Sequence, residues 1–175
     1  DHQLLGDVDI MSAQVEVTHQ VVGYLRRTVS GEILDYTELD MPRHTLPTRA
    51  VMYTITPDLL EQAGIEPHRV PGALHAAEHA AIGLLPLVAM CDRGDIGGVS
   101  TALHADTLLP TVFVYDGHPG GAGFADRGYA RLRDWLAATR DAIKACECEF
   151  GCPSCVYSPK CGNGNDPLDK AGAVI

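Results

Sequence analysis

The chain has 175 residues, a length that suits one domain with a hydrophobic core of its own. Its hydrophobic content of 46% and charged content of 21% are those of an ordinary globular protein, and no run approaches the roughly 18–20 apolar residues of a membrane helix. The net charge of −10 argues against nucleic-acid binding by this segment alone, because binding to a phosphate backbone depends on clustered cations. We therefore expect no membrane partner, and a nucleic-acid role only inside a larger protein.

The N-terminal residues predict strands that pair with their neighbours. Residues 15–24 alternate apolar and polar side chains in their first part, as a half-buried strand does. A turn at Gly31 follows, and residues 33–39 are expected to pair back after it.

Two prolines divide the next segment. Pro42 and Pro47 predict a loop over residues 41–49, and residues 51–56 predict another strand. A short helix is expected between Pro57 and Gly64. The first third of the chain therefore predicts a small, mostly antiparallel β-region.

The middle of the chain predicts a buried helix and a central strand. Residues 73–90 are apolar on nearly every face, which indicates a buried helix, with a kink near Gly83–Pro86. Residues 91–100 are too rich in Gly and Asp for regular structure. Residues 110–117 form a short apolar run, consistent with a central strand.

A long helix is expected over residues 122–145, followed directly by a cysteine-rich segment. Its apolar side chains keep helical spacing: Phe124, Leu132, Trp135, Leu136 and Ile143. Residues 165–175 read as the start of a further helix.

Five of the six cysteines fall between Cys146 and Cys161, with the spacing C-x-C-x3-C-x2-C-x5-C. Disulfides between such close neighbours are rarely all free of strain, and nothing indicates export. A redox C-x-x-C motif usually opens a helix beside a strand, whereas Cys152-Pro-Ser-Cys155 lies between other cysteines. A structural Zn²⁺ site fits best, because four thiolates in a tetrahedron need short turning loops. An iron–sulfur cluster and a disulfide or redox site are the alternatives.

Four of the five clustered thiols are expected to bind the metal. Cys152 and Cys155 are the safest pair, and Cys146 and Cys148 supply the other half unless Cys161 replaces one of them. A closed four-thiolate site has no open position for water, so we expect a structural ion rather than a catalytic one. It would fix a polar tail against the preceding helix.

Together these elements predict an α+β fold in a single domain, residues 1–175. We expect a small antiparallel β-rich part (about 1–66), a part with helices packed on a short sheet (about 67–145), and a C-terminal four-cysteine zinc clip (about 146–165).

The segment His75-Ala-Ala-Glu78-His79 matches the H-x-x-E-H pattern of inverted zinc metallopeptidases, in which the histidines bind Zn²⁺ and the Glu serves as base. The alternative is an internal polar network in a buried helix, which requires hydrogen-bond partners. Three candidate partners follow in the sequence: Asp92, Arg93 and Asp95. A second metal or nuclease-like site that uses Asp92 and Asp95 also stays open.

The segment Tyr115–Gly123 predicts a strand, a Gly-rich turn and a helix. Such a turn offers backbone amides to an anion, although it lacks the Lys-Ser/Thr of a P-loop and the spacing of a dinucleotide fingerprint. One interpretation is a tight turn that lets helix and strand pack closely. The other is contact with a phosphate, for example in a nucleic-acid backbone.

Four segments, taken in order, resemble one family. They are ALHAAEHA (73–80), CDRGDIGG (91–98), TVFVYDGHPGGAG (111–123) and CECEFGCPSCVYSPKCGNGNDPLDKAGA (146–173). The chain resembles, from about Val15 to its end, the C-terminal zinc-binding domain of MrfA-like superfamily-2 DNA repair helicases, a group that includes SftH and is related to the fungal Hrq helicases.

This resemblance implies an accessory domain behind the RecA-like motor domains and winged-helix region of an ATP-dependent 3′-to-5′ DNA helicase acting in repair. It implies that the domain binds Zn²⁺ and helps to hold single-stranded DNA. Cys146, Cys148, Cys152 and Cys155 match the family's cysteine positions, and Cys161 matches a further frequent one.

The sequence contains no ATPase motif, so ATP and Mg²⁺ belong to motor domains outside it, and this segment is not expected to be catalytic by itself. A cytoplasmic, nucleoid-associated protein is expected. Two alternatives from other classes stay open: a zinc metalloenzyme that uses the His75/Glu78/His79 helix, and a protein-interaction module.

Overall fold

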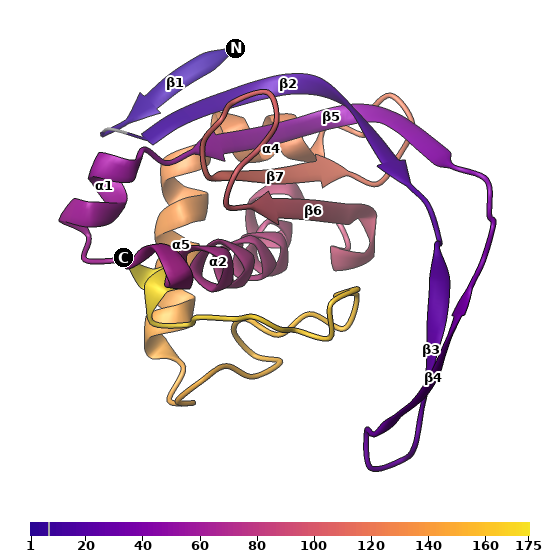
Figure 1. Cartoon of the computed structure of the whole chain (residues 1–175). Helices are drawn as coiled ribbons and strands as arrows, with labels where there is room; N and C mark the ends of the chain where they lie inside the picture. The colour runs from indigo at the N-terminus through magenta and orange to yellow at the C-terminus, as the bar shows by residue number, and fades with distance from the viewer. Residues whose placement is uncertain (7) are drawn as a thin grey trace.

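A computed structural model describes residues 1–6 and 8–175 of the chain (Figure 1). Five strands form one sheet in the order β1-β2-β5-β7-β6, and two more form the separate hairpin β3-β4. All the pairings are antiparallel. The strands are β1 (His2–Leu5), β2 (Val8–His19), β3 (Gly23–Arg27), β4 (Ile33–Glu38), β5 (His44–Thr54), β6 (Ile96–Thr101) and β7 (Thr111–Asp116). The main sheet thus joins strands from the first third of the chain with strands that follow the buried helix.

The helices are α1 (Pro57–Gln62), α2 (Val70–Leu84), α3 (Pro86–Ala89), α4 (Phe124–Ala130) and α5 (Leu132–Ala145), with short 3-10 turns η1 (Pro67–Arg69), η2 (Arg93–Asp95) and η3 (Gly172–Val174). Of the helices, α2 and α4 pack directly on the sheet, and α3 and α5 pack against them. The expected α+β class is confirmed: an antiparallel sheet, helices packed on it, and a C-terminal group of four cysteines.

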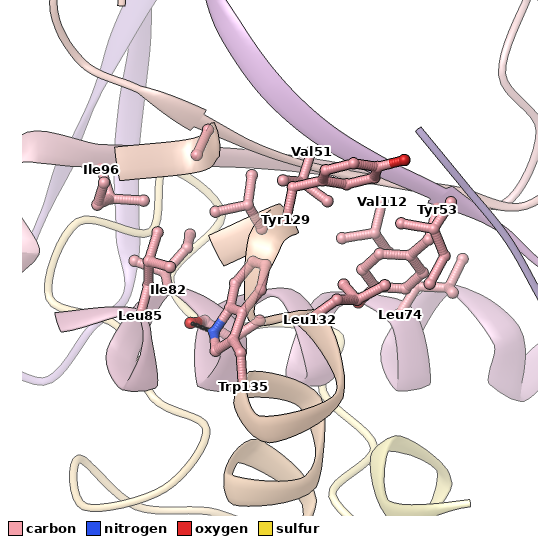
Figure 2. Close-up of a cluster of buried hydrophobic side chains, with 14 of the residues drawn as sticks. Val51, Tyr53, Leu74, Ile82, Leu85, Ile96, Val112, Tyr129, Leu132 and Trp135 are labelled. Atoms are coloured by element: carbon pink, nitrogen blue, oxygen red, sulfur yellow. Dashed lines mark hydrogen bonds between the residues drawn. The ribbon is translucent and has the colours of Figure 1, made fainter. Parts of the chain in front are cut away.

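The core lies between α2 and the sheet. Side chains alternate along a strand, so Val112 and Val114 of β7 both face the helices and are fully buried. Figure 2 shows Trp135 of α5 reaching into this layer beside α2. The Trp135 side chain is fully buried, and its Nε1–H donates to the carbonyl of Ala81 at 2.9 Å. One residue thus ties α5 to α2.

Most of the expected elements are present, and the boundaries of several differ. The strand expected over residues 15–24 is divided, because β2 ends at His19 and pairs with β5. The segment expected to pair back is β4, and it pairs with β3 instead. The kink expected near Gly83–Pro86 is the break between α2 and α3. The expected helix over residues 122–145 is interrupted at Arg131, where φ is −118° and ψ is 31°. In place of the expected C-terminal helix start there are turns and η3.

The prediction of a loop over residues 41–49 was wrong, because β5 begins at His44 and runs through Pro47. Proline lacks an N–H, so it is tolerated only where one side of a strand is unpaired. Here β7 pairs with β5 only over residues 50–54, which leaves the Pro47 stretch paired with β2 alone. The carbonyl of Pro47 instead accepts a hydrogen bond from the N–H of Gly120 at 2.8 Å.

The prediction of irregular structure over residues 91–100 was also wrong, because β6 occupies its second half. Its glycines are explained by close neighbours. A Cβ at Gly98 would lie 2.7 Å from Oε1 of Glu78, and one at Gly97 would lie 2.4 Å from the ring of Tyr115. Gly98 therefore lets α2 approach the edge strand β6, and Gly97 makes room for the ring of Tyr115 from β7.

The stretch Pro67–Ala89 spans 23 residues and is long and apolar enough to cross a membrane, although no such stretch was expected from the sequence. In the fold, 61% of its most apolar window is buried inside the protein. Its main part is α2, which packs against β6, β7 and α5, so it is a core helix.

Candidate metal centre

Four thiols converge directly after α5, and we call them the cysteine cluster: Cys146, Cys148, Cys152 and Cys155. Their Sγ–Sγ distances include 3.5 Å (Cys146 to Cys152), 3.6 Å (Cys146 to Cys148), 3.5 Å (Cys148 to Cys155) and 3.8 Å (Cys152 to Cys155). A tetrahedral zinc with Zn–S bonds of about 2.3 Å has sulfurs about 3.8 Å apart. The separations are too long for disulfide bonds of about 2.05 Å. The four sulfurs are therefore arranged to hold one zinc-sized ion.

Backbone and side-chain donors surround these sulfurs. The N–H of Ser154 lowers the pKa of the Cys152 thiol to about 7, and the N–H of Cys152 donates to Sγ of Cys155 at 3.4 Å. Nζ of Lys170 lies 3.3 Å from Sγ of Cys148. Burial raises the pKa of the Cys155 thiol, but a coordinating metal removes the proton of a thiol outright. The donors thus favour the thiolate forms that a metal requires.

The cysteine cluster is fastened to two helices by a small apolar core of its own. Cys155 and Val156 are buried against Ala76 and Ala80 of α2 and Ile143 of α5. The alanines are fully buried and small, so the cysteine-bearing turn approaches α2 closely. Figure 1 shows this C-terminal segment running alongside α2 and α5. The cluster therefore connects the chain's polar tail to the core, as the sequence suggested.

The fifth clustered cysteine lies elsewhere. Sγ of Cys161 is 3.4 Å from Nε2 of His75, and it forms a second group with His75 and His79, which we call the His–Cys cluster. The three ligand atoms lie within 4.8 Å of one another. Because Cys161 and His75 are 86 positions apart, no local spacing in the sequence signals this contact.

The histidines of the H-x-x-E-H segment are held by the C-terminal segment. Nδ1 of His75 lies 2.8 Å from the carbonyl of Pro167, and Nδ1 of His79 lies 2.8 Å from the carbonyl of Val156. A carbonyl only accepts, so each ring carries its proton on Nδ1 and keeps a lone pair on Nε2. Glu78, which lies between the two histidines in the sequence, is buried. Burial raises the pKa of its carboxyl group, and a hydrogen bond from Ser100 partly offsets this rise.

The three candidate partners named from the sequence make other contacts, and backbone carbonyls take their place beside the histidines. Oδ1 of Asp92 accepts from the N–H of Gly94 at 2.7 Å, and Oδ2 of Asp95 accepts from the N–H of Asp92 at 3.0 Å. The two carboxylates cap their own 3-10 turn. Nη2 of Arg93 lies 3.4 Å from the carbonyl of Tyr157.

The Gly-rich turn before α4 is a tight turn whose amides are already in use. The buried carboxylate of Asp116 accepts hydrogen bonds from the N–H groups of Ala122, Gly123 and Ala125 at 2.6, 2.8 and 2.7 Å. Gly123 has a φ of +88°, a conformation that favours glycine. A carboxylate of the protein itself thus takes the place that the alternative interpretation gave to a phosphate.

Comparison with known proteins matches residues 77–156 to the family model of the MrfA Zn-binding domain. An uncharacterized protein of Methanocaldococcus jannaschii is 38% identical over 104 residues, which cover 58% of this chain and 93% of that protein. The ATP-dependent helicase YprA of Bacillus subtilis, itself uncharacterized, is 44% identical over 73 residues, 42% of this chain and 10% of that protein.

A similar fold occurs in a solved structure. The crystal structure of the DUF1998 helicase MrfA bound to DNA matches 90% of this chain and 21% of that chain, with a TM-score of 0.72 and 28% identity. The matched region is about a fifth of the crystallised helicase and a tenth of YprA. The M. jannaschii protein, in contrast, matches this chain over 93% of its own length.

Proposed function

Because the chain belongs to the MrfA zinc-binding domain family, we propose that it is a non-catalytic, zinc-stabilised accessory domain of an ATP-dependent 3′-to-5′ DNA helicase acting in DNA repair. In this proposal the domain helps to hold single-stranded DNA while motor domains elsewhere in the same protein use ATP and Mg²⁺. The observation that carries the proposal is the likeness of nearly the whole chain to part of a helicase crystallised with DNA.

The four sulfurs of the cysteine cluster are the proposed zinc ligands. Their separations fit a tetrahedral ion, and the nearby backbone N–H groups and Lys170 favour thiolates. When bound, the ion supplies a cross-link rather than a reaction, because four thiolates leave no open coordination position. Cys155 and Val156 are packed against α2 and α5. The bound ion would therefore fasten the C-terminal segment to these two helices.

The β3-β4 hairpin supports the proposal that other parts of the same protein pack on this domain. Figure 1 shows the hairpin projecting well away from the sheet and helices. It exposes large apolar side chains, including Tyr24, Leu25, Ile33, Leu34 and Tyr36. Exposed apolar surface of this kind commonly marks a contact with another domain or partner. We propose that the hairpin packs against the rest of the helicase.

We also propose that the working protein is cytoplasmic and associated with the nucleoid. The six cysteines form no disulfide in the part of the chain that the structure describes. Unpaired thiols are typical of reducing compartments, which supports this placement.

Removal of the domain from the full-length helicase tests the proposed function. The expected result is weaker binding of single-stranded DNA in gel-shift assays and slower unwinding, with ATP hydrolysis retained by the motor domains. If the shortened helicase binds and unwinds DNA as well as the intact one, the DNA-holding role is wrong, and a module that recruits protein partners becomes the better explanation.

A further inference from the structure

We propose that His75, His79 and Cys161 form a second metal site, separate from the cysteine cluster and taking Zn²⁺ or a similar divalent transition metal. Two imidazoles and a thiolate are ligands that suit zinc. The three ligand atoms lie within 4.8 Å of one another, and the two rings lie edge to face, with centroids 4.3 Å apart and an interplanar angle of 63°. The inference does not depend on the proposed role in DNA binding.

The histidines are prepared for such a role by their other ring nitrogens. Histidines that bind a metal usually donate their remaining N–H to a carbonyl or carboxylate, which fixes the tautomer and the ring orientation. Both rings meet this condition, since each Nδ1 lies 2.8 Å from a backbone carbonyl. The His75 and His79 rings are also on successive turns of α2, four positions apart, so a rigid helix sets their spacing.

Hydrogen bonds within its own loop fix the position of the Cys161 thiol. Asn165 bridges the loop that contains Cys161: its Oδ1 accepts from the N–H of Ser158 at 2.7 Å, and its Nδ2 donates to the carbonyl of Ser158 at 3.1 Å. The backbone N–H of Asn165 also donates to Sγ of Cys161 at 3.3 Å. The loop thus presents a sulfur with an amide donor to the two imidazoles, as the cysteine cluster does with the N–H of Cys152.

Three protein ligands leave one position of a tetrahedron for a small molecule. A cavity of about 720 Å³ opens on the His–Cys cluster and is also lined by Glu78, Ser100 and Lys160. Zinc sites with three protein ligands commonly keep water in the fourth position. We infer that water, or a small donor from the cavity, completes this site.

This geometry differs from the metallopeptidase pattern that the H-x-x-E-H segment resembles in sequence. There the neighbouring acidic residue acts as a base, whereas here Glu78 packs over Gly98, where an added Cβ would lie 2.7 Å from its Oε1. The third ligand is the thiol of Cys161, which comes from the C-terminal loop. The site therefore links α2 to that loop.

Metal content of the intact chain, saturated with Zn²⁺ and desalted, tests the inference. Elemental analysis by mass spectrometry should find two zinc ions per chain, and a chelator should remove one of them first, because a three-ligand site holds its ion less tightly than a four-thiolate site. His79→Ala and Cys161→Ser should each lower the content from two ions to one. Cys91→Ser, which changes a thiol outside both clusters, should leave it at two.

Cobalt provides an independent measurement. In the Co²⁺-loaded chain, Cys161→Ser should remove a minor part of the sulfur-to-cobalt charge-transfer absorption, whereas Cys152→Ser should remove a larger part. A wild-type chain that holds only one ion after saturation overturns the proposal, and His75 and Cys161 are then a hydrogen-bonded pair. Retention of two ions by a folded Cys161→Ser variant also overturns it. If the variants unfold, the number of zinc ions per wild-type chain is sufficient to test the second site: two ions support it and one ion overturns it.

Discussion

Among the single residues, Cys155 connects the metal centre most directly to the core. Its side chain is buried with Val156, and its sulfur lies 3.5 Å from that of Cys148. We predict that Cys155→Ser abolishes the tightly bound zinc and lowers the Tm by about 10 °C or more, because metal binding is coupled to folding and each 1 kcal/mol shifts the Tm of a chain this size by about 2–4 °C.

Calorimetry together with zinc analysis checks this prediction, and Cys91→Ser serves as the matched control. A wild-type melting temperature that does not change when a strong chelator removes the zinc would contradict a structural role for the ion.

Asp126 supplies a pH-dependent contact between α4 and the sheet. Its Oδ1 lies 2.7 Å from Nη2 of Arg49 and 2.9 Å from Oγ of Ser12. The hydrogen bond from Arg49 holds the pKa of Asp126 below its ordinary value of 3.8. The ionised carboxylate therefore contributes stability above that ordinary pKa and loses it as the pH falls through the lower value in the folded protein.

We predict that Asp126→Asn costs less than about 1 kcal/mol at pH 7, since the side chain is nearly half exposed. The difference from the wild type should shrink as the pH falls below the ordinary pKa. Urea unfolding at pH 7 and pH 3 measures both values, and an equal difference at the two pH values would exclude the ion pair as its cause.

At the scale of elements, the packing of α2 on β6 depends on Gly98. An added Cβ there would lie 2.7 Å from both Oε1 of Glu78 and Cδ1 of Ile82, so these two side chains of α2 would have to move and repack. We predict that Gly98→Ala destabilises the chain by about 1–3 kcal/mol, the usual cost of overpacking. Chemical denaturation measures the change.

Gly83 within α2 offers the matched control for this substitution. Its nearest neighbour for an added Cβ is the guanidinium of Arg93, at an ordinary contact distance of 3.7 Å. Gly83→Ala should therefore be neutral or stabilise the chain by up to about 1 kcal/mol, because alanine favours a helix. Equal destabilisation by the two substitutions would show that the close approach of α2 is not the cause.

At the scale of the whole molecule, the proposed role in holding DNA needs a surface, and we propose the exposed face of α5. Arg133, Arg140 and Lys144 are exposed and recur at intervals of seven and four positions, so they lie on one side of the helix. The chain as a whole carries a net charge of −10, and a local row of cations is the feature that a phosphate backbone requires.

We predict that the double substitution of Arg133 and Lys144 by alanine weakens the binding of single-stranded DNA by the full-length helicase. The loss of two phosphate contacts should reduce the slope of log K against log salt by about 1.4. The paired substitution of Arg43 and Arg127 by alanine removes the same charge from exposed positions outside α5 and outside the hairpin, and it should leave the slope unchanged. An equal effect of both double variants would point to net charge instead of a contact by α5.

The order of the helices, the buried character of α2 and the grouping of four cysteines could be predicted because their signals are local. Apolar periodicity and the spacing from Cys146 to Cys155 act within a few turns of chain. The strand through Pro47 could not be predicted, because its tolerance depends on where β7 ends. The strand β6 could not be predicted either. Its glycines are typical of irregular structure in the sequence, and only the neighbouring side chains in the fold explain them.

The sequence by itself determined the fold class and the family resemblance, and it predicted that four of the five clustered thiols share one site without deciding which four. Only the tertiary structure decided where the fifth clustered thiol goes. Cys161 meets His75 and His79 because the chain returns across α2 after the cysteine cluster, and Asn165 closes the loop that holds it there. A contact between residues 86 positions apart depends on the packing of the whole chain, which no short-range pattern encodes.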